Sequence, residues 1–71
     1  MHFNANKGDR VCAASMITEE NFMGRGRHVH ARQGDLGVVQ KVDGEWLTVT
    51  WVLTGTTYDS HISDLQASQA N

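Results

Sequence analysis

The sequence predicts an all-β domain, built as a small barrel of about five short antiparallel strands with a long irregular loop at 15–33. Short runs of alternating apolar and polar residues are separated by turn residues at close spacing. Asp43-Gly44 stands between two such runs and is a strong hairpin signal. No segment is long enough for the crossover helix that a parallel sheet needs, so we expect antiparallel strands.

The size and composition of the chain allow one domain with one small core. The chain has 71 residues, of which 39% are hydrophobic, and such a domain buries only about 60% of the surface of its unfolded chain. We expect a single domain over 1–71, with an ordered core at about 7–66 and frayed ends. A ligand site would be a surface groove or would form between subunits, which leaves self-association open.

Charge is small overall but unevenly distributed. The formal net charge of −2 argues against nonspecific binding of nucleic acid. All six basic residues lie at or before Lys41, together with four of the eight acidic ones. This part therefore has a charge of 6 − 4 = +2, and the remainder has a charge of −4.

The location of the protein is predicted to be cytoplasmic. Cys12 is the only cysteine, so no internal disulfide is expected, and a small buried hydrophobic residue is a more common role for such a cysteine than a nucleophile. No apolar run predicts a transmembrane helix, and residues 1–7 lack the hydrophobic core of a signal peptide. We expect no membrane association.

The first expected strand lies within residues 7–14, after a turn. Strand alternation places Val11 and Ala13 on one side and Arg10 and Cys12 on the other.

The loop at 15–33 contains few regular signals. Residues 18–23 are expected to form a short helical turn with Thr18 as its cap, too short to be stable by itself. The glycines within 24–27 end this turn, and 28–32 is predicted as a short strand or the edge of an extended loop.

Two central strands are expected at 36–42 and 45–53, joined by a type I′ turn at Asp43-Gly44. The opposite face of the second strand carries Trp46, which is expected to be exposed or half-exposed. Three residues of the second strand share the core face: Leu47, Val49 and Trp51.

A bulge is expected in the first central strand. Val39 and Val42 are three residues apart, so both can face inward only where the strict alternation is interrupted. Gly34 and Gly37 suit such a bend or bulge.

The last expected elements are a fourth strand at 57–62 and a 3₁₀ turn at 63–66, which returns Leu65 to the core. Asp59-Ser60-His61 contains the residue types of a hydrolase triad, but adjacent strand residues point to opposite faces. We expect this order to be a coincidence, and Asp59 or Asp64 to cap the terminal turn.

The order of these motifs resembles an SH3-like barrel over about 8–66. The motifs are Gly-Asp-Arg-Val at 8–11, Gly-x-x-Gly-x-Val-x-x-Val at 34–42, a tryptophan-bearing strand at 45–53 and Ser-Asp-Leu-Gln at 63–66. The pattern is similar to KOW-type small barrels, the ferredoxin–thioredoxin reductase variable chain, the small photosystem I barrel subunit and the nitrogen-fixation Z protein. These families bind very different partners, so the resemblance implies a fold rather than one partner.

One enzyme family also resembles this chain, the plasmid-encoded, trimethoprim-resistant dihydrofolate reductases. They share Gly-Asp-Arg-Val followed by a tryptophan-containing barrel, and they build one pore active site from four subunits. Their late strand carries Val-Gln-Ile-Tyr, whereas the matching region 55–59 shares only Tyr58. The resemblance therefore implies an oligomeric reductase only as a disfavoured alternative.

The candidate binding residues lie in the basic segment 24–32 and at two aromatic positions. Guanidinium groups can contact a partner's carboxylates or phosphates, while in a solvated loop they would pair with Asp35, Glu19 or Glu20. The predicted binding residues are Arg25, Arg27, His28, His30, Arg32, Trp46 and Tyr58.

A metal site is not expected. His28 and His30 share one face of an extended segment, and His61 with Asp59 or Asp64 could complete a ligand set. No recognised ligand spacing supports this, so a surface histidine pair is the expectation.

These observations predict a non-enzymatic binding or adaptor module without a cofactor. It is expected to dock a partner protein with an acidic surface through the 24–32 loop and the adjacent aromatic residues. The alternatives are a KOW-like module that binds nucleic acid and the oligomeric reductase.

Overall fold

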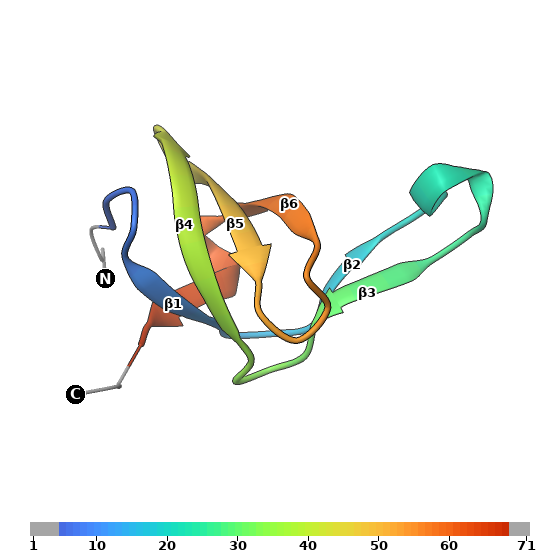
Figure 1. Cartoon of the computed structure of the whole chain (residues 1–71), viewed down its shortest axis with the longest axis horizontal. Helices are drawn as coiled ribbons and strands as arrows, with labels where there is room; N and C mark the ends of the chain where they lie inside the picture. Colours follow the sequence, from blue (N-terminus) through green and yellow to red (C-terminus); the bar gives the residue numbers. More distant parts are fainter. Residues whose placement is uncertain (1–4, 69–71) are drawn as a thin grey trace.

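The computed structural model describes residues 5–68, and the regular structure of this part consists of β-strands and short 3₁₀ turns (Figure 1). It contains no α-helix, and none of its helical turns is long and apolar enough to cross a membrane. The all-β class is therefore confirmed. The elements in chain order are β1 Arg10–Ala13, β2 Ile17–Glu19, η1 Phe22–Gly24, β3 His28–Ala31, β4 Leu36–Asp43, β5 Trp46–Trp51, β6 Thr57–His61, η2 Ile62–Asp64 and β7 Leu65–Ala67.

Five of the strands form one antiparallel sheet, and β2 and β3 form a separate hairpin. The order in the sheet is β6-β5-β4-β1-β7. Figure 1 shows the sheet curling around its core while the hairpin extends away from it. Within residues 5–68 no ladder joins the outer strands β6 and β7, so the sheet is open in its hydrogen bonds.

The segment expected as an irregular loop is a β-hairpin. Ile17 pairs with Ala31 and Glu19 pairs with His28, with a register shift after Ile17. The expected helical turn at 18–23 is wrong for its first two residues and is reduced to η1 at the tip of the hairpin. So short a helix is unstable alone, whereas cross-strand pairing satisfies the main-chain groups of both segments.

The turn between β4 and β5 lies one residue later than expected. Asp43 pairs with Trp46, which leaves Gly44 and Glu45 as the two turn residues. Gly44 has φ +61°, and the two residues beside it lie outside the positive-φ region. Positive φ at the first central residue alone fits a type II′ turn rather than the expected type I′ turn.

The expected bulge is present in β4 and puts Val42 on the same face as Val39, since they pair with the buried Leu47 and Val49 respectively, but Val42 is only partly covered. The register between β4 and β5 shifts between Val39 and Lys41. Val39 is fully buried, whereas Val42 is 43% exposed. The reason is that β1 pairs only with residues 36–38, so the far end of β4 has no strand on that side.

The core lies on the inner face of the curled sheet, and the hairpin also contributes to it. Alternation along β5 buries the three residues that the sequence assigned to the core face, and Leu65 is buried as expected. Ile17 and Ala31 come from the hairpin. The buried apolar residues are Val11, Ala13, Ile17, Ala31, Val39, Leu47, Val49, Trp51 and Leu65.

Three smaller expectations are corrected. Ala67 was expected in a frayed end but lies in β7 and pairs with Val11 of β1. Residues 1–4 and 69–71 lie outside the described part. The cap of η2 is His61, whose Nδ1 accepts a hydrogen bond from the Ser63 N–H at 3.1 Å. Cys12, expected to be buried, is a free thiol that is only half-buried.

Candidate functional site

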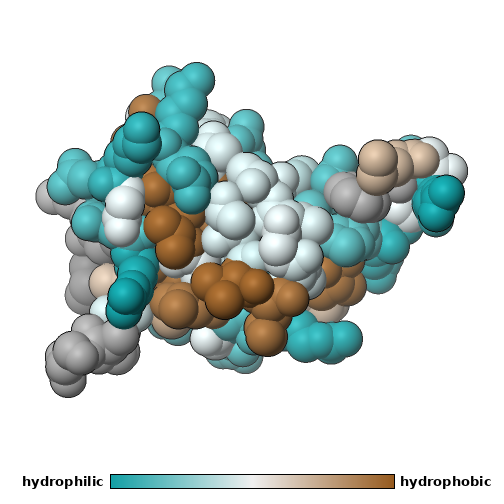
Figure 2. Space-filling model, in the orientation of Figure 1, coloured by the Kyte–Doolittle hydropathy of each residue, from teal (hydrophilic) through white to brown (hydrophobic). Residues whose placement is uncertain are grey.

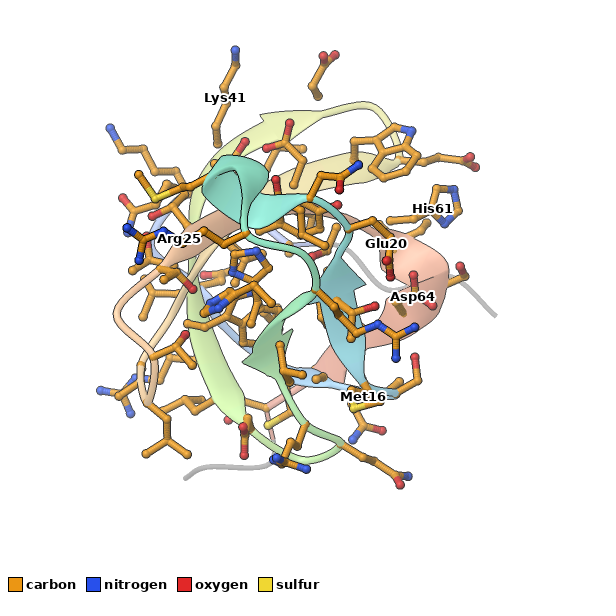
Figure 3. The ribbon with its side chains drawn as sticks, turned by 90° about the vertical axis from the view of Figure 1, so that its right-hand side faces the viewer. Met16, Glu20, Arg25, Lys41, His61 and Asp64 are labelled. Atoms are coloured by element: carbon orange, nitrogen blue, oxygen red, sulfur yellow. The ribbon has the colours of Figure 1, made fainter. Side chains whose placement is uncertain are left out.

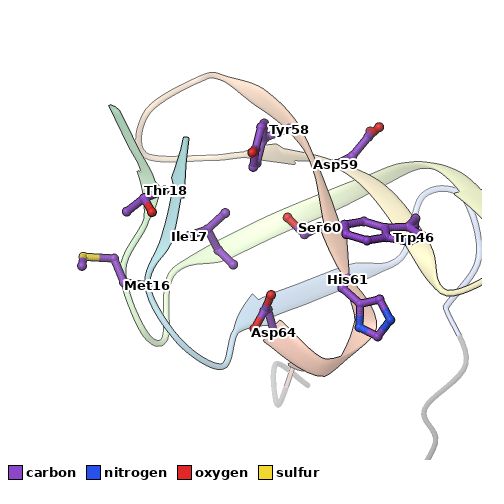
Figure 4. Close-up of a pocket in the computed structure, with 9 residues that line it drawn as sticks. All are labelled: Met16, Ile17, Thr18, Trp46, Tyr58, Asp59, Ser60, His61 and Asp64. Atoms are coloured by element: carbon purple, nitrogen blue, oxygen red, sulfur yellow. The ribbon is translucent and has the colours of Figure 1, made fainter. Parts of the chain in front are cut away.

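A groove runs between the hairpin and β6, with a volume of ≈ 290 Å³ (Figure 4). One wall is formed by residues 16–18 at the start of the hairpin. The other is formed by residues 58–61 of β6 with Trp46, and Asp64 of η2 lies at one end. The groove therefore depends on how the hairpin lies against the sheet.

The floor of the groove contains an unpaired hydroxyl group. Ser60 is 3% exposed, and its Oγ has no hydrogen-bond partner among the described residues. In Figure 4 this hydroxyl points across the groove towards Ile17. A buried hydroxyl without a partner costs about 1–3 kcal/mol, so a bound polar group at this position would be stabilising.

The aromatic side chains of the groove come from β5 and β6. Trp46 is 53% exposed, because the alternation that buries Leu47 turns it outward. Its ring meets the His61 ring edge-on, with centroids 5.1 Å apart. Tyr58 is half-buried in the same wall.

The groove is acidic. Asp59 and Asp64 are among its lining residues, which include no lysine or arginine. The Asp59 carboxylate accepts a hydrogen bond from Thr48 Oγ1 at 2.7 Å. At the rim, His61 Nε2 lies 3.3 Å from the carboxylate of Glu45, which adds a third acid to this side.

His30 joins the hairpin to the sheet from a buried position. Its Nε2 lies 2.9 Å from Glu19 Oε1, and because a carboxylate only accepts, this nitrogen carries the proton. Its Nδ1 lies 2.7 Å from Thr56 Oγ1, and Thr54 Oγ1 donates to its carbonyl at 2.9 Å. The ring stacks on Tyr58 with centroids 4.4 Å apart. The position of the hairpin is thus coupled to a wall of the groove.

We expect His30→Ala to lower the free energy of unfolding by about 1–3 kcal/mol, because Glu19 and Thr56 lose their partner. The loss should be largest locally, so amide hydrogen exchange should accelerate more in β2 and β3 than in β4 and β5. Arg25→Ala, at the exposed tip, is the matched control and should change neither quantity. Equal acceleration in all strands would contradict the proposed coupling.

The structure separates the residues that the sequence grouped into one binding site. Trp46 and Tyr58 line the groove, but the basic residues do not. In Figure 3 Arg25 lies on the opposite side of the hairpin from His61 and Asp64. Arg27 is exposed and pairs with Glu20 at 3.0 Å, one of the pairings considered from the sequence.

The expected pair of surface histidines is wrong for His30, which is 1% exposed. His28 is half-buried, and its ring lies edge-on to that of His30 with centroids 4.5 Å apart, so the two do share a face. His30 can support a binding surface but cannot form part of it directly.

A second, apolar surface lies at the turn after β5, where Figure 2 shows hydrophobic residues gathered along the lower side of the molecule. Val52 and Leu53 are 55% and 79% exposed. Leu53 also borders a hollow of ≈ 240 Å³ together with Arg32, so Arg32 lines this hollow and not the groove. The Arg32 N–H donates to Asp35 Oδ2 at 2.9 Å, which holds the adjoining turn.

Sequence reasoning missed most of the groove. Met16 and Asp64 come together only through the tertiary fold, and Asp59-Ser60-His61 was considered only as a triad. Strand alternation, which argues against a triad, also indicates where the groove lies. It turns Ser60 inward, between two polar residues that face outward. In the described structure Asp59 bonds to Thr48 rather than to His61.

The described residues contain no cluster of three or more histidine, cysteine or acidic side chains that could hold a metal ion. They do contain a groove with an exposed aromatic wall, acidic ends and a polar floor. Comparisons of the chain with protein-family models, with curated proteins and with solved structures find no match.

Proposed function

We propose that this chain is a non-enzymatic binding module of the SH3-like class, which docks a partner protein across the groove and the adjacent hairpin. The order of elements supports the class: β4, β5 and β6 form a meander, η2 leads from β6 into β7, and β1 lies between β4 and β7. Closure of the curled sheet into a barrel through η2 is part of this proposal.

The observation that carries the docking proposal is the exposed indole of Trp46 beside an open groove. The fold requires only that this position face outward, and a polar residue would serve that purpose as well. A large exposed aromatic side chain next to a groove is typical of an interface anchor. Tyr58 extends the same surface, and the buried Ser60 hydroxyl lies at the floor of the groove.

The tip of the hairpin provides a second, weaker contact in this proposal. Arg25 is exposed there, and Arg27 is held by the exposed ion pair with Glu20. Exposed ion pairs contribute little energy, so a carboxylate of the partner can compete for Arg27. We therefore propose that the acidic surface of the partner, expected from the sequence, contacts the tip of the hairpin rather than the groove.

We expect Trp46→Ala to abolish retrieval of a specific partner without unfolding the protein. The test is affinity retrieval from the native host with the immobilised chain, after nuclease treatment, followed by mass spectrometry. Val42→Ala is the matched control, because Val42 is an apolar side chain of similar exposure that lies outside the groove. A partner that is retained equally by both variants would contradict the proposal.

The same experiment separates the alternatives. Retrieval that is lost on nuclease treatment, and that falls steeply with salt, would indicate nucleic acid instead. The reductase alternative requires a tetramer, together with NADPH-dependent loss of absorbance in the presence of dihydrofolate. A monomer in sedimentation would exclude it.

A further inference from the structure

Two strand edges face the groove without a ladder partner. Within residues 5–68, β6 pairs only with β5 and β2 pairs only with β3. Figure 4 shows these two strands on opposite walls of the groove. Strand edges present main-chain N–H and C=O groups with which an added segment can pair. The groove therefore suits an extended stretch of polypeptide.

The floor of the groove favours a ligand with polar groups along its length. The Ser60 hydroxyl is buried, lacks a partner in the described structure and points into the groove. A purely apolar side chain placed above it would leave this hydroxyl unpaired. A main-chain carbonyl or N–H group of an extended segment would satisfy it.

The charge of the groove favours a cationic side chain on that segment. Asp59 and Asp64 line the groove, Glu45 lies at its rim, and no lysine or arginine is among the lining residues. The exposed face of the Trp46 ring can also hold a cation beside these carboxylates. Arg25 does not oppose this, because it lies on the other side of the hairpin in Figure 3, and the charge of Arg27 is offset by its ion pair with Glu20.

We infer that the groove binds an extended segment of the partner, which lies between β2 and β6 and places an arginine or lysine side chain between Trp46 and the carboxylates of Asp59 and Asp64. The inference rests on the proposed function and adds the chemistry of the partner segment. Main-chain pairing to the strand edges provides the orientation, and the cation provides the selectivity.

The test is an NMR titration of the isotope-labelled full chain with synthetic heptapeptides of alternating threonine and valine, capped at both ends. One peptide has a central arginine, one has citrulline, which is neutral and of similar shape, and one has glutamate. We expect shifts in the amides of β2 and β6 and in the Trp46 indole. The arginine peptide should bind about tenfold more tightly than the citrulline peptide.

Two neutralising variants test the position of the cation. Asp59→Asn and Asp64→Asn should each weaken the binding of the arginine peptide more than that of the citrulline peptide and so remove the preference for arginine. Asp9→Asn is the matched control, because Asp9 is exposed just before β1 and does not line the groove. Loss of the preference in this control would overturn the placement.

Other results would overturn the inference directly. These are equal affinity for the arginine and citrulline peptides, preference for glutamate, shifts confined to the hairpin tip, or no shift at millimolar peptide. If any of them occurs while partner retrieval still depends on Trp46, the proposed function stands and only the cationic, extended segment is rejected.

Discussion

We expect Trp51→Ala to lower the free energy of unfolding by about 3–5 kcal/mol, which is enough to unfold a large fraction of the molecules of a domain this small. Trp51 is fully buried and is the largest side chain of the core. Its removal leaves a cavity that a short, curled sheet cannot close. Urea denaturation followed by circular dichroism would measure the loss.

The second tryptophan provides the matched control for this prediction. Trp46→Ala removes the same side chain from a position that is 53% exposed, so its cost should stay below about 1 kcal/mol. Trp51→Phe should also be milder than Trp51→Ala, because it keeps a ring and removes an indole N–H that has no partner among the described residues. Similar losses for the two alanine variants would contradict the assignment of Trp51 to the core.

Gly37→Ala is expected to have the second largest effect, about 1–3 kcal/mol or more of destabilisation. Gly37 lies in β4 beneath the Trp51 ring, and a Cβ there would come within 2.8 and 2.9 Å of Cε3 and Cζ3 of that ring. It would also collide with Cγ1 of Val49. Neither neighbour can move easily, because both are fully buried.

Two further variants show whether space is the cause. Gly55→Ala is the control, because Gly55 has φ +70° but open space around it, so only backbone strain would contribute. Val49→Ala removes one of the colliding groups, so the double variant with Gly37→Ala should lose less stability than the sum of the two single variants. Strict additivity in thermal or urea unfolding would show that crowding against Val49 is not responsible.

The sequence was most informative where a local pattern decides the structure. Alternation along β5 identified Leu47 and Trp51 as core residues and Trp46 as outward-facing. Such patterns are readable because neighbouring strand residues point to opposite faces whatever the strand pairs with. The position of the turn after Asp43 was predicted to within one residue. The type of the turn was predicted wrongly, because the type depends on the register in which the two strands pair.

The sequence was least informative where distant segments meet. The strands β2 and β3 have only 3 and 4 residues, too few for a periodic signal, and their pairing becomes apparent only when both are seen together. The burial of His30 could not be predicted for the same reason. Its partners Glu19 and Thr56 stand 11 and 26 residues away along the chain.

In the candidate site, too, the features set by a local pattern could be predicted, and those set by tertiary contacts could not. The two aromatic residues assigned to binding do line the groove, since strand alternation turns Trp46 outward and Tyr58 remains half-exposed in the same wall. The arginines were grouped with them because they are close in sequence and charged, but the hairpin carries Arg25 to the opposite side (Figure 3). Met16 and Asp64 reach the groove only through the tertiary fold.

By itself, then, the sequence determined an all-β domain, its central hairpin and the buried face of β5, because these follow from the period of the strand and the conformational needs of turns. Only the tertiary structure decided that residues 17–31 form a hairpin, that His30 attaches it to the sheet, and that an acidic groove opens beside β6. These features depend on which distant segments pack together, and contacts of that kind leave no periodic pattern in a chain.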